Sequence, residues 1–149
     1  KKMLIVRNMQ LSDAGEIARL EKCAFSDAWT EKGILDTFHQ QQAFVVIGEM
    51  NEKIVGYCIM YYVLDEGEIA RIAVDDTCKR QGVGRAILNQ VECICKEKAI
   101  TKILLDVRES NETARAFYRD YGFVEDGIRK NFYEMPKEHA VLMSKDVIW

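Results

Sequence analysis

The sequence contains little proline, no excess of positive charge and no long apolar run. One proline among 149 residues leaves no proline-rich linker between domains. Lysine and arginine number 21 against 24 acidic residues, and a formal net charge of -3 gives no overall positive field for a nucleic-acid backbone. The first apolar stretch ends at Arg7, far short of a signal peptide or a membrane span. We therefore expect one domain over residues 1–149, located in the cytoplasm, with neither nucleic acid nor membrane as a partner.

Cysteine is present but lacks the even count of a disulfide framework and the paired spacing of a zinc site. The residues are Cys23, Cys58, Cys78, Cys93 and Cys95. Cys93 and Cys95 stand two apart on a predicted helix, which puts them on nearly opposite sides of it. We expect reduced thiols, as in a cytosolic protein, and no metal site.

The hydrophobic pattern predicts a mixed α/β sheet flanked by helices. β-rich runs predict strands at 3–8, 43–50, 53–64, 68–76, 102–109, 123–133 and 139–147. Helical spacing predicts helices that begin near Ser12, Thr30, Val83 and Asn111. We expect Ser12, Thr30 and Asn111 to cap their helices, and the turn "FSDAW" between the first two helices to expose its aromatic side chains. Lys1 and Lys2 precede the first predicted strand and carry no part of this prediction.

The strand "EIARIAVDD" at 68–76 is expected to alternate regularly between the two faces of the sheet. One face would carry Glu68, Ala70, Ile72 and Val74. The opposite face would carry Ile69, Arg71 and Ala73.

Residues 79–86 follow this strand and read "KRQGVGRA". A Walker loop needs a lysine and a serine or threonine after its last glycine, where this sequence has Arg85 and Ala86. A Rossmann fingerprint needs a third glycine at the position of Ile87. A glycine turn that opens a helix still presents backbone N–H groups and the positive end of the helix dipole to an anion, and Arg80 and Arg85 add charge. The loop is therefore predicted to bind a diphosphate.

"RQGVGRA" after "RIAVDD" is similar to the Q/R-x-x-G-x-G/A motif of the GNAT N-acetyltransferase superfamily. "LLDVRESNETARAFYRDYGF" at 104–123 and "IRKNFY" at 128–133 resemble two further motifs of the RimI-type ribosomal-protein-alanine N-acetyltransferases. The resemblance covers nearly the whole chain. It implies the GNAT fold, acetyl-CoA as co-substrate without a metal, and direct attack by an amine in a ternary complex.

The resemblance also implies roles for individual residues. Those expected to bind acetyl-CoA are Ile72, Ala73, Val74, Arg80, Gln81, Gly82, Val83, Gly84, Arg85 and Asn111. The strand backbone would pair with the pantetheine arm as an added β-strand does, and the two glycines would let the loop approach the diphosphate. Tyr118, seven residues after Asn111 and on the same helix face, would be the general acid that protonates the leaving thiolate.

The general base stays open between two carboxylates. RimI-type enzymes carry a glutamate where this sequence has Asp106, whose shorter side chain favours a water relay over direct abstraction of a proton. Glu68, on the neighbouring strand, is the alternative base. Burial of either carboxylate would raise its pKa and improve it as a base.

The amine acceptor is also open. The resemblance implies that the acceptor is the N-terminal α-amine of a protein, of the ribosomal-protein-alanine type. The paired tyrosines of the family appear here as Phe132 and Tyr133, and the acidic position before the alanine of the last strand holds His139, which we expect to be a surface-loop histidine. These departures keep two alternatives in view, a small amine as acceptor or a non-catalytic domain that senses acyl-CoA.

Overall fold

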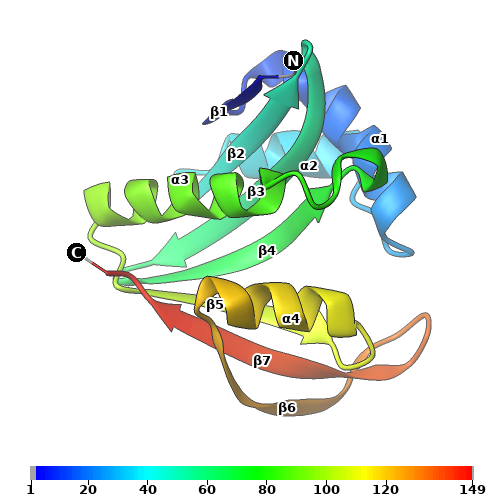
Figure 1. Ribbon diagram of the computed structural model, residues 1–149, viewed down its shortest axis with the longest axis vertical. Coiled ribbons are helices and arrows are strands. Elements are labelled where there is room, and N and C mark those ends of the chain that lie inside the picture. The colour runs from blue at the N-terminus through cyan, green and yellow to red at the C-terminus, as the bar shows by residue number, and fades with distance from the viewer. Residues whose placement is uncertain (1–2, 149) are drawn as a thin grey trace.

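The computed structural model describes residues 3–148, so Lys1, Lys2 and Trp149 lie outside the described residues. It contains a seven-stranded sheet with the order β1-β2-β3-β4-β5-β7-β6 (Figure 1). The strands are β1 (Leu4–Asn8), β2 (Ala43–Met50), β3 (Lys53–Val63), β4 (Glu66–Val74), β5 (Lys102–Arg108), β6 (Val124–Tyr133) and β7 (Glu138–Asp146). The helices are α1 (Ala14–Ala24), α2 (Glu31–Phe38), α3 (Val83–Glu97) and α4 (Glu112–Tyr121). The predicted mixed α/β sheet flanked by helices is confirmed.

Helices cover the two faces of the sheet unequally. α3 and α4 pack on one face, over a core that includes Ile87, Val91 and Tyr118. α1 and α2 pack on the other face, where Ile17 and Ile34 are fully buried against β2 and β3. In Figure 1 this second face is covered over β2 to β4, whereas no described helix covers it behind β5, β7 and β6. Along residues 3–148, no helix is long and apolar enough to cross a membrane.

β4 and β5 are neighbours in the sheet over a short length. They pair in parallel through Glu66–Glu68 and Lys102–Leu104, whereas the other neighbouring strands are antiparallel. Beyond these residues the two strands diverge, and the first turns of α3 and α4 lie over the wide end of the gap (Figure 1). A parallel pair that ends so early leaves one edge of β4 without a strand neighbour.

A β-bulge in β4 makes the predicted regular alternation wrong. Ile59 of β3 is opposite Arg71 and Met60 is opposite Ile69, so Ala70 is the extra residue. Ile69 therefore faces the same core as Ile72 and Val74, whereas Ala70 and Ala73 face α1 and α2. An inserted residue reverses the alternation of side chains, and the pattern within one strand contains no sign of it.

α3 packs closely on the sheet because two glycines face it. Gly48 and Gly56 are directly opposite each other on β2 and β3. A Cβ atom would lie 3.2 Å from Ile87 Cδ1 at Gly48 and 3.0 Å from it at Gly56. Cys95 is buried on this helix and Cys93 is exposed, which confirms that the two thiols lie on different sides. The position of α3 is thus set by the bare backbone beneath Ile87.

Two helices are capped by a residue close in sequence, and the first helix is capped through a contact with another strand. Thr30 accepts a hydrogen bond from the Gly33 N–H at 3.0 Å, and Asn111 accepts one from the Ala114 N–H at 3.1 Å, which confirms both predicted caps. The predicted cap of the first helix at Ser12 is wrong. α1 begins at Ala14 after a 3₁₀ turn, and the Asp13 carboxylate accepts from the backbone N–H two residues before Ser12. An ion pair at 2.8 Å from Arg7 of β1 holds that carboxylate, so a contact between elements selects it.

Replacing Gly56 with alanine is expected to destabilise the fold by about 1–3 kcal/mol, because the new methyl group would overpack the α3 interface. It would lie 3.1 Å from the Ala73 carbonyl oxygen, which is backbone and cannot swing away. Gly127→Ala is the matched control, since no atom lies within 4 Å of its Cβ position. Urea unfolding of both variants measures the difference. Equal stability of the two would contradict this account of the α3 packing.

Candidate active site

Most of the predicted site residues lie along the gap between β4 and β5. Ile72, Ala73 and Val74 form the end of β4 beyond its pairing with β5. Their backbone pairs with β3 on one side, as in Tyr57 opposite Ala73. The other edge faces the gap, so its N–H and C=O groups are free to pair with an extended ligand.

The loop before α3 forms a cradle of backbone N–H groups. In the described part of the chain, no acceptor lies within hydrogen-bond reach of the N–H groups from Arg80 to Arg85. Arg80 and Gly82 adopt positive φ angles of 66° and 80°, which turn successive N–H groups toward one side. α3 begins at Val83 with Gly82 as its N-cap and no side-chain cap, so its positive dipole end points at the same place. Free N–H groups at the positive end of a helix dipole are an arrangement that can bind an anion.

Each of the two glycines in this loop is required for a different structural reason. Gly82 takes the left-handed backbone conformation, and a Cβ there would meet no atom within 4 Å. A Cβ at Gly84 would lie 2.9 Å from Phe117 Cζ of α4. Gly84 thus allows α3 and α4 to approach each other at the gap, a role in packing that differs from the ligand contact expected of it.

Tyr118 presents an unbonded hydroxyl from the α4 side. Its side chain is 7% exposed and packs edge-on against Phe117 and Phe123. Among residues 3–148 its hydroxyl has no hydrogen-bond partner. Every fully buried side-chain oxygen and nitrogen in the same range has one. The hydroxyl must therefore reach accessible space. Burial, with the nearby Cys58 and Tyr133, raises the pKa of Tyr118, so it stays protonated at neutral pH.

Glu68 and Asp106 lie on the opposite face of the sheet from Tyr118. Ile69 and the alternate β5 residues Leu105 and Val107 face the α3 and α4 core, so the residues between them face the other way. Glu68 is at the last paired position of β4, opposite Leu104, and Asp106 is two residues farther along β5. Asp106 is therefore at the start of the gap, half-buried, while Glu68 is more exposed.

Both carboxyl groups have raised pKa values. Burial raises the pKa of Asp106, and the positive charge of Arg129 opposes this. Burial also raises the pKa of Glu68, with a contribution from the negative charge of Asp106. Two carboxylates in one electrostatic field next to a gap are the environment in which a general base is found.

Tyr133 lines the same face of the gap. The Arg108 guanidinium lies 4.4 Å from the centre of its ring, and burial together with Asp106 raises the pKa of Tyr133 to about 12. The prediction of a surface-loop His139 is wrong. His139 lies in β7, half-buried, and its Nδ1 accepts a hydrogen bond from the Asn131 N–H at 2.9 Å. The left-handed turn at Asn131, with φ 52°, aims this N–H across the hairpin.

Sequence reasoning missed a buried ion pair on the side of α1. Glu21 is 0% exposed and accepts from Arg71 at 3.0 Å. Phe25 and Trp29, predicted to be exposed, are half-buried: the Arg71 guanidinium lies 4.0 Å from the centre of the Phe25 ring, and Trp29 packs against the α1 and α2 core. The available signal was a glutamate four residues after Ile17 on the apolar face of a helix, which calls for a cationic partner.

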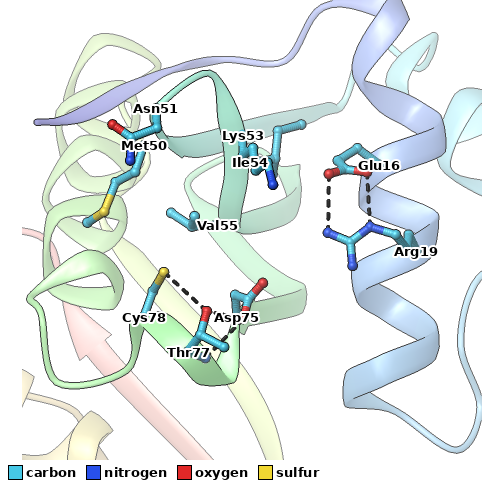
Figure 2. Close-up of a pocket in the computed structure, with 10 residues that line it drawn as sticks. All are labelled: Glu16, Arg19, Met50, Asn51, Lys53, Ile54, Val55, Asp75, Thr77 and Cys78. Atoms are coloured by element: carbon cyan, nitrogen blue, oxygen red, sulfur yellow. Dashed lines mark hydrogen bonds and ion pairs between the residues drawn. The ribbon is translucent and has the colours of Figure 1, made fainter. Parts of the chain in front are cut away.

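The hollow drawn in Figure 2 is separate from this gap. It has a volume of about 640 Å³ and lies between α1, the β2–β3 hairpin and the turn after β4. Its lining residues are Glu16, Arg19, Met50, Asn51, Lys53, Ile54, Val55, Asp75, Thr77 and Cys78. None of the predicted site residues lines it. A second hollow of about 680 Å³ beside α3 and β7 includes Arg85 alone of the predicted set.

The chain is similar to acetyltransferases of known sequence and structure. The family model of the acetyltransferase (GNAT) family matches residues 14–123. The [ribosomal protein bS18]-alanine N-acetyltransferase of Escherichia coli strain K12 is 31% identical over 147 residues, which cover 95% of this chain and 97% of that protein.

Two solved structures are similar along nearly their full lengths. The crystal structure of the ribosomal-protein-S18-alanine N-acetyltransferase from Escherichia coli gives a TM-score of 0.89 at 29% identity, with 99% of this chain and 96% of that chain covered. The structure of Ard1 from Thermoplasma volcanium gives 0.90 at 26% identity, with 98% and 99% covered.

Asp106→Asn is expected to be at least as stable as the wild type at pH 7. The pKa of Asp106 is higher in the folded protein, so its contribution to stability is present below the unfolded pKa of about 4 and lost as the pH rises through the folded pKa. Melting temperatures between pH 3.5 and 7.5 measure this, with Asp36→Asn, in a surface pair with Lys32, as the control. A loss of stability in Asp106→Asn at pH 7 would show that the carboxylate is stabilised in the fold by its neighbours.

Proposed function

Because the chain belongs to the GNAT acetyltransferase family, we propose that it moves the acetyl group of acetyl-CoA to the N-terminal α-amine of a protein. One observation carries the proposal: an anion cradle, an unbonded tyrosine hydroxyl and a half-buried carboxylate border one gap in the sheet. Residues 1–149 would form a single catalytic domain, since all described strands belong to one sheet. A ribosomal acceptor would place the reaction in the cytoplasm.

Acetyl-CoA would bind across the α3 and α4 side of the gap. The N–H groups from Arg80 to Arg85 would hold its diphosphate, and the free edge of Ile72–Val74 would pair with the amide groups of its pantetheine arm. Arg80 is exposed and adds positive charge, while Arg85 lies 5.2 Å from the Tyr121 ring centre on the α4 side. Asn111 caps α4 and would also contact the co-substrate.

Tyr118 would act on the leaving group. The amine nitrogen attacks the acetyl carbonyl carbon, the carbon–sulfur bond breaks, and the coenzyme A sulfur leaves as a thiolate. A tyrosine with a raised pKa is fully protonated at neutral pH and can donate its hydrogen to that sulfur. Its accessible hydroxyl, without a partner in the described chain, is free for this contact.

Asp106 would be the base, through a water molecule. An α-amine with a pKa near 8 needs only about 1–1.5 kcal/mol to lose its proton at pH 7, against about 4–5 for a lysine amine. Asp106 lies at the start of the gap and its charge reaches Tyr133, whereas Glu68 is farther out on the paired part of β4. The amine would arrive from the carboxylate face and the thiolate would leave toward Tyr118. Glu68 would be the alternative base, with its own pKa raised by burial and by the charge of Asp106.

The relatives support a ribosomal acceptor, since the Escherichia coli protein is named for the alanine of ribosomal protein bS18. The test incubates the protein with labelled acetyl-CoA and a peptide with the N-terminal sequence of bS18. Transfer to this peptide, and none to an Nα-blocked copy that keeps a lysine, is the expected result. Turnover of a polyamine or aminoglycoside well above any peptide would replace the proposal with a small-amine enzyme. Binding of acetyl-CoA without turnover would indicate a sensor.

Tyr118→Phe is expected to lower kcat by about 10²–10³-fold, the usual contribution of a general acid, and to leave the KM for acetyl-CoA unchanged. Tyr121→Phe is the control on the same helix, because its hydroxyl donates to Asn89 Oδ1 at 2.8 Å away from the gap. Steady-state kinetics of both variants decide the matter. Equal kcat values for the two variants would rule out the general-acid role.

A further inference from the structure

The loop between α1 and α2 is fastened to β4 by a single arginine. Arg71 Nη2 donates to the Asp27 carbonyl oxygen at 3.0 Å and to Asp27 Oδ1 at 3.1 Å. The same guanidinium stacks on Phe25 and lies near Trp29. Arg71 therefore contacts three residues of this loop: it forms hydrogen bonds with Asp27 in the middle of the loop and lies near the aromatic rings of Phe25 and Trp29 at its two ends.

A buried carboxylate fixes the guanidinium in turn. The Glu21 carboxylate accepts hydrogen bonds from Arg71 Nε at 3.1 Å and Nη2 at 3.0 Å. It also accepts from the Tyr57 hydroxyl at 2.5 Å and the Trp29 N–H at 2.9 Å. A buried ion pair adds little to stability once both ions have been taken out of water. What this pair does supply is direction, because a planar guanidinium held along one edge has its remaining donors in a fixed plane.

The fastened loop lies beside the carboxylate side of the gap. Arg71 follows the bulge residue Ala70 on the face covered by α1 and α2, the face that Glu68 and Asp106 share farther along the sheet. The charges of Asp27 and Arg71 both reach the Tyr133 hydroxyl, although burial and Asp106 dominate its pKa.

The loop also contacts the opposite bank of the gap. Ser26 Oγ donates to the Met135 carbonyl at 2.9 Å, and Arg108 Nη1 donates to the Pro136 carbonyl at 2.9 Å. Residues 25–29 and 135–136 thus meet across the two diverging halves of the sheet. In the described chain, Arg71 is the β4 side chain that donates hydrogen bonds to residues 25–29, and it does so at Asp27, between the Ser26 contact to Met135 and the Trp29 contact to Glu21.

We propose that Arg71 is a positioning residue for the amine acceptor: it holds residues 25–29 as one wall of the acceptor's entrance to the gap. The inference rests on the proposed function, because it assumes that the amine enters on this face. Lysine could not replace it. A single ammonium group could not form the two-nitrogen contact of Nε and Nη2 with Glu21 and bond Asp27 as well.

The test compares Arg71→Lys and Asp27→Ala with Asp36→Ala. Asp27 and Asp36 are matched, since their side chains are 62% and 61% exposed and each forms an ion pair. We expect the acceptor-peptide KM to rise about tenfold in Arg71→Lys and somewhat less in Asp27→Ala, the effect of losing one charge-assisted hydrogen bond at the wall. The KM for acetyl-CoA and the kinetics of Asp36→Ala should stay at wild-type values. Amide hydrogen exchange should speed up at 25–29 in the first two variants.

Three outcomes would overturn the proposal. The first is unchanged exchange at 25–29 in Arg71→Lys. The second is faster exchange with an unchanged acceptor KM, which would leave Arg71 a structural role alone. The third is an equal rise in both KM values, which would indicate distortion of the whole gap. A wild-type protein that acetylates no amine would refute the proposed function instead, and the exchange result alone would then decide whether Arg71 orders this loop.

Discussion

Backbone pairing between β4 and β5 covers Glu66–Glu68 and then stops, and the proposed active site depends on this separation of the two strands. A continuous sheet would satisfy every backbone group of β4 and leave no place for an extended ligand. The bulge at Ala70 turns the strand where the parting begins. The open edge, the cradle before α3 and the start of α4 all border the resulting gap (Figure 1).

A sheet that divides needs other contacts to hold its halves. On one face α3 and α4 do so, since Gly84 lets Phe117 approach and Tyr118 joins the core that also contains Cys58 of β3. On the other face no described helix extends behind β5, and the loops at 25–29 and 135–136 meet instead. The two faces thus differ in kind: one is sealed by apolar packing and the other is bridged by hydrogen bonds.

This difference suits the two partners of an acetyl transfer. The packed face lowers the local polarity around Tyr118 and keeps its proton in place. The bridged face retains charged groups, where Asp106 and Glu68 lie in the field of Arg129 and hold raised pKa values. In the proposed reaction, the amine and the thiolate would therefore use opposite sides of one opening, and each proton transfer would have its own residue. Carboxylates with raised pKa values lower stability at neutral pH, as reactive groups in active sites commonly do.

The sequence by itself determined the elements, the caps at Thr30 and Asn111, the buried stripe of α3 and the anion loop before it, because each depends on residues within a few positions of one another. Tertiary structure decided the rest. The bulge depends on register with β3, and the cap at Asp13 depends on Arg7 of another strand. Arg71 and Glu21 are 50 residues apart, and the end of the parallel pairing places Asp106 beside the gap and Glu68 on the paired part of β4. Such contacts join segments distant in the chain, and no local pattern encodes them.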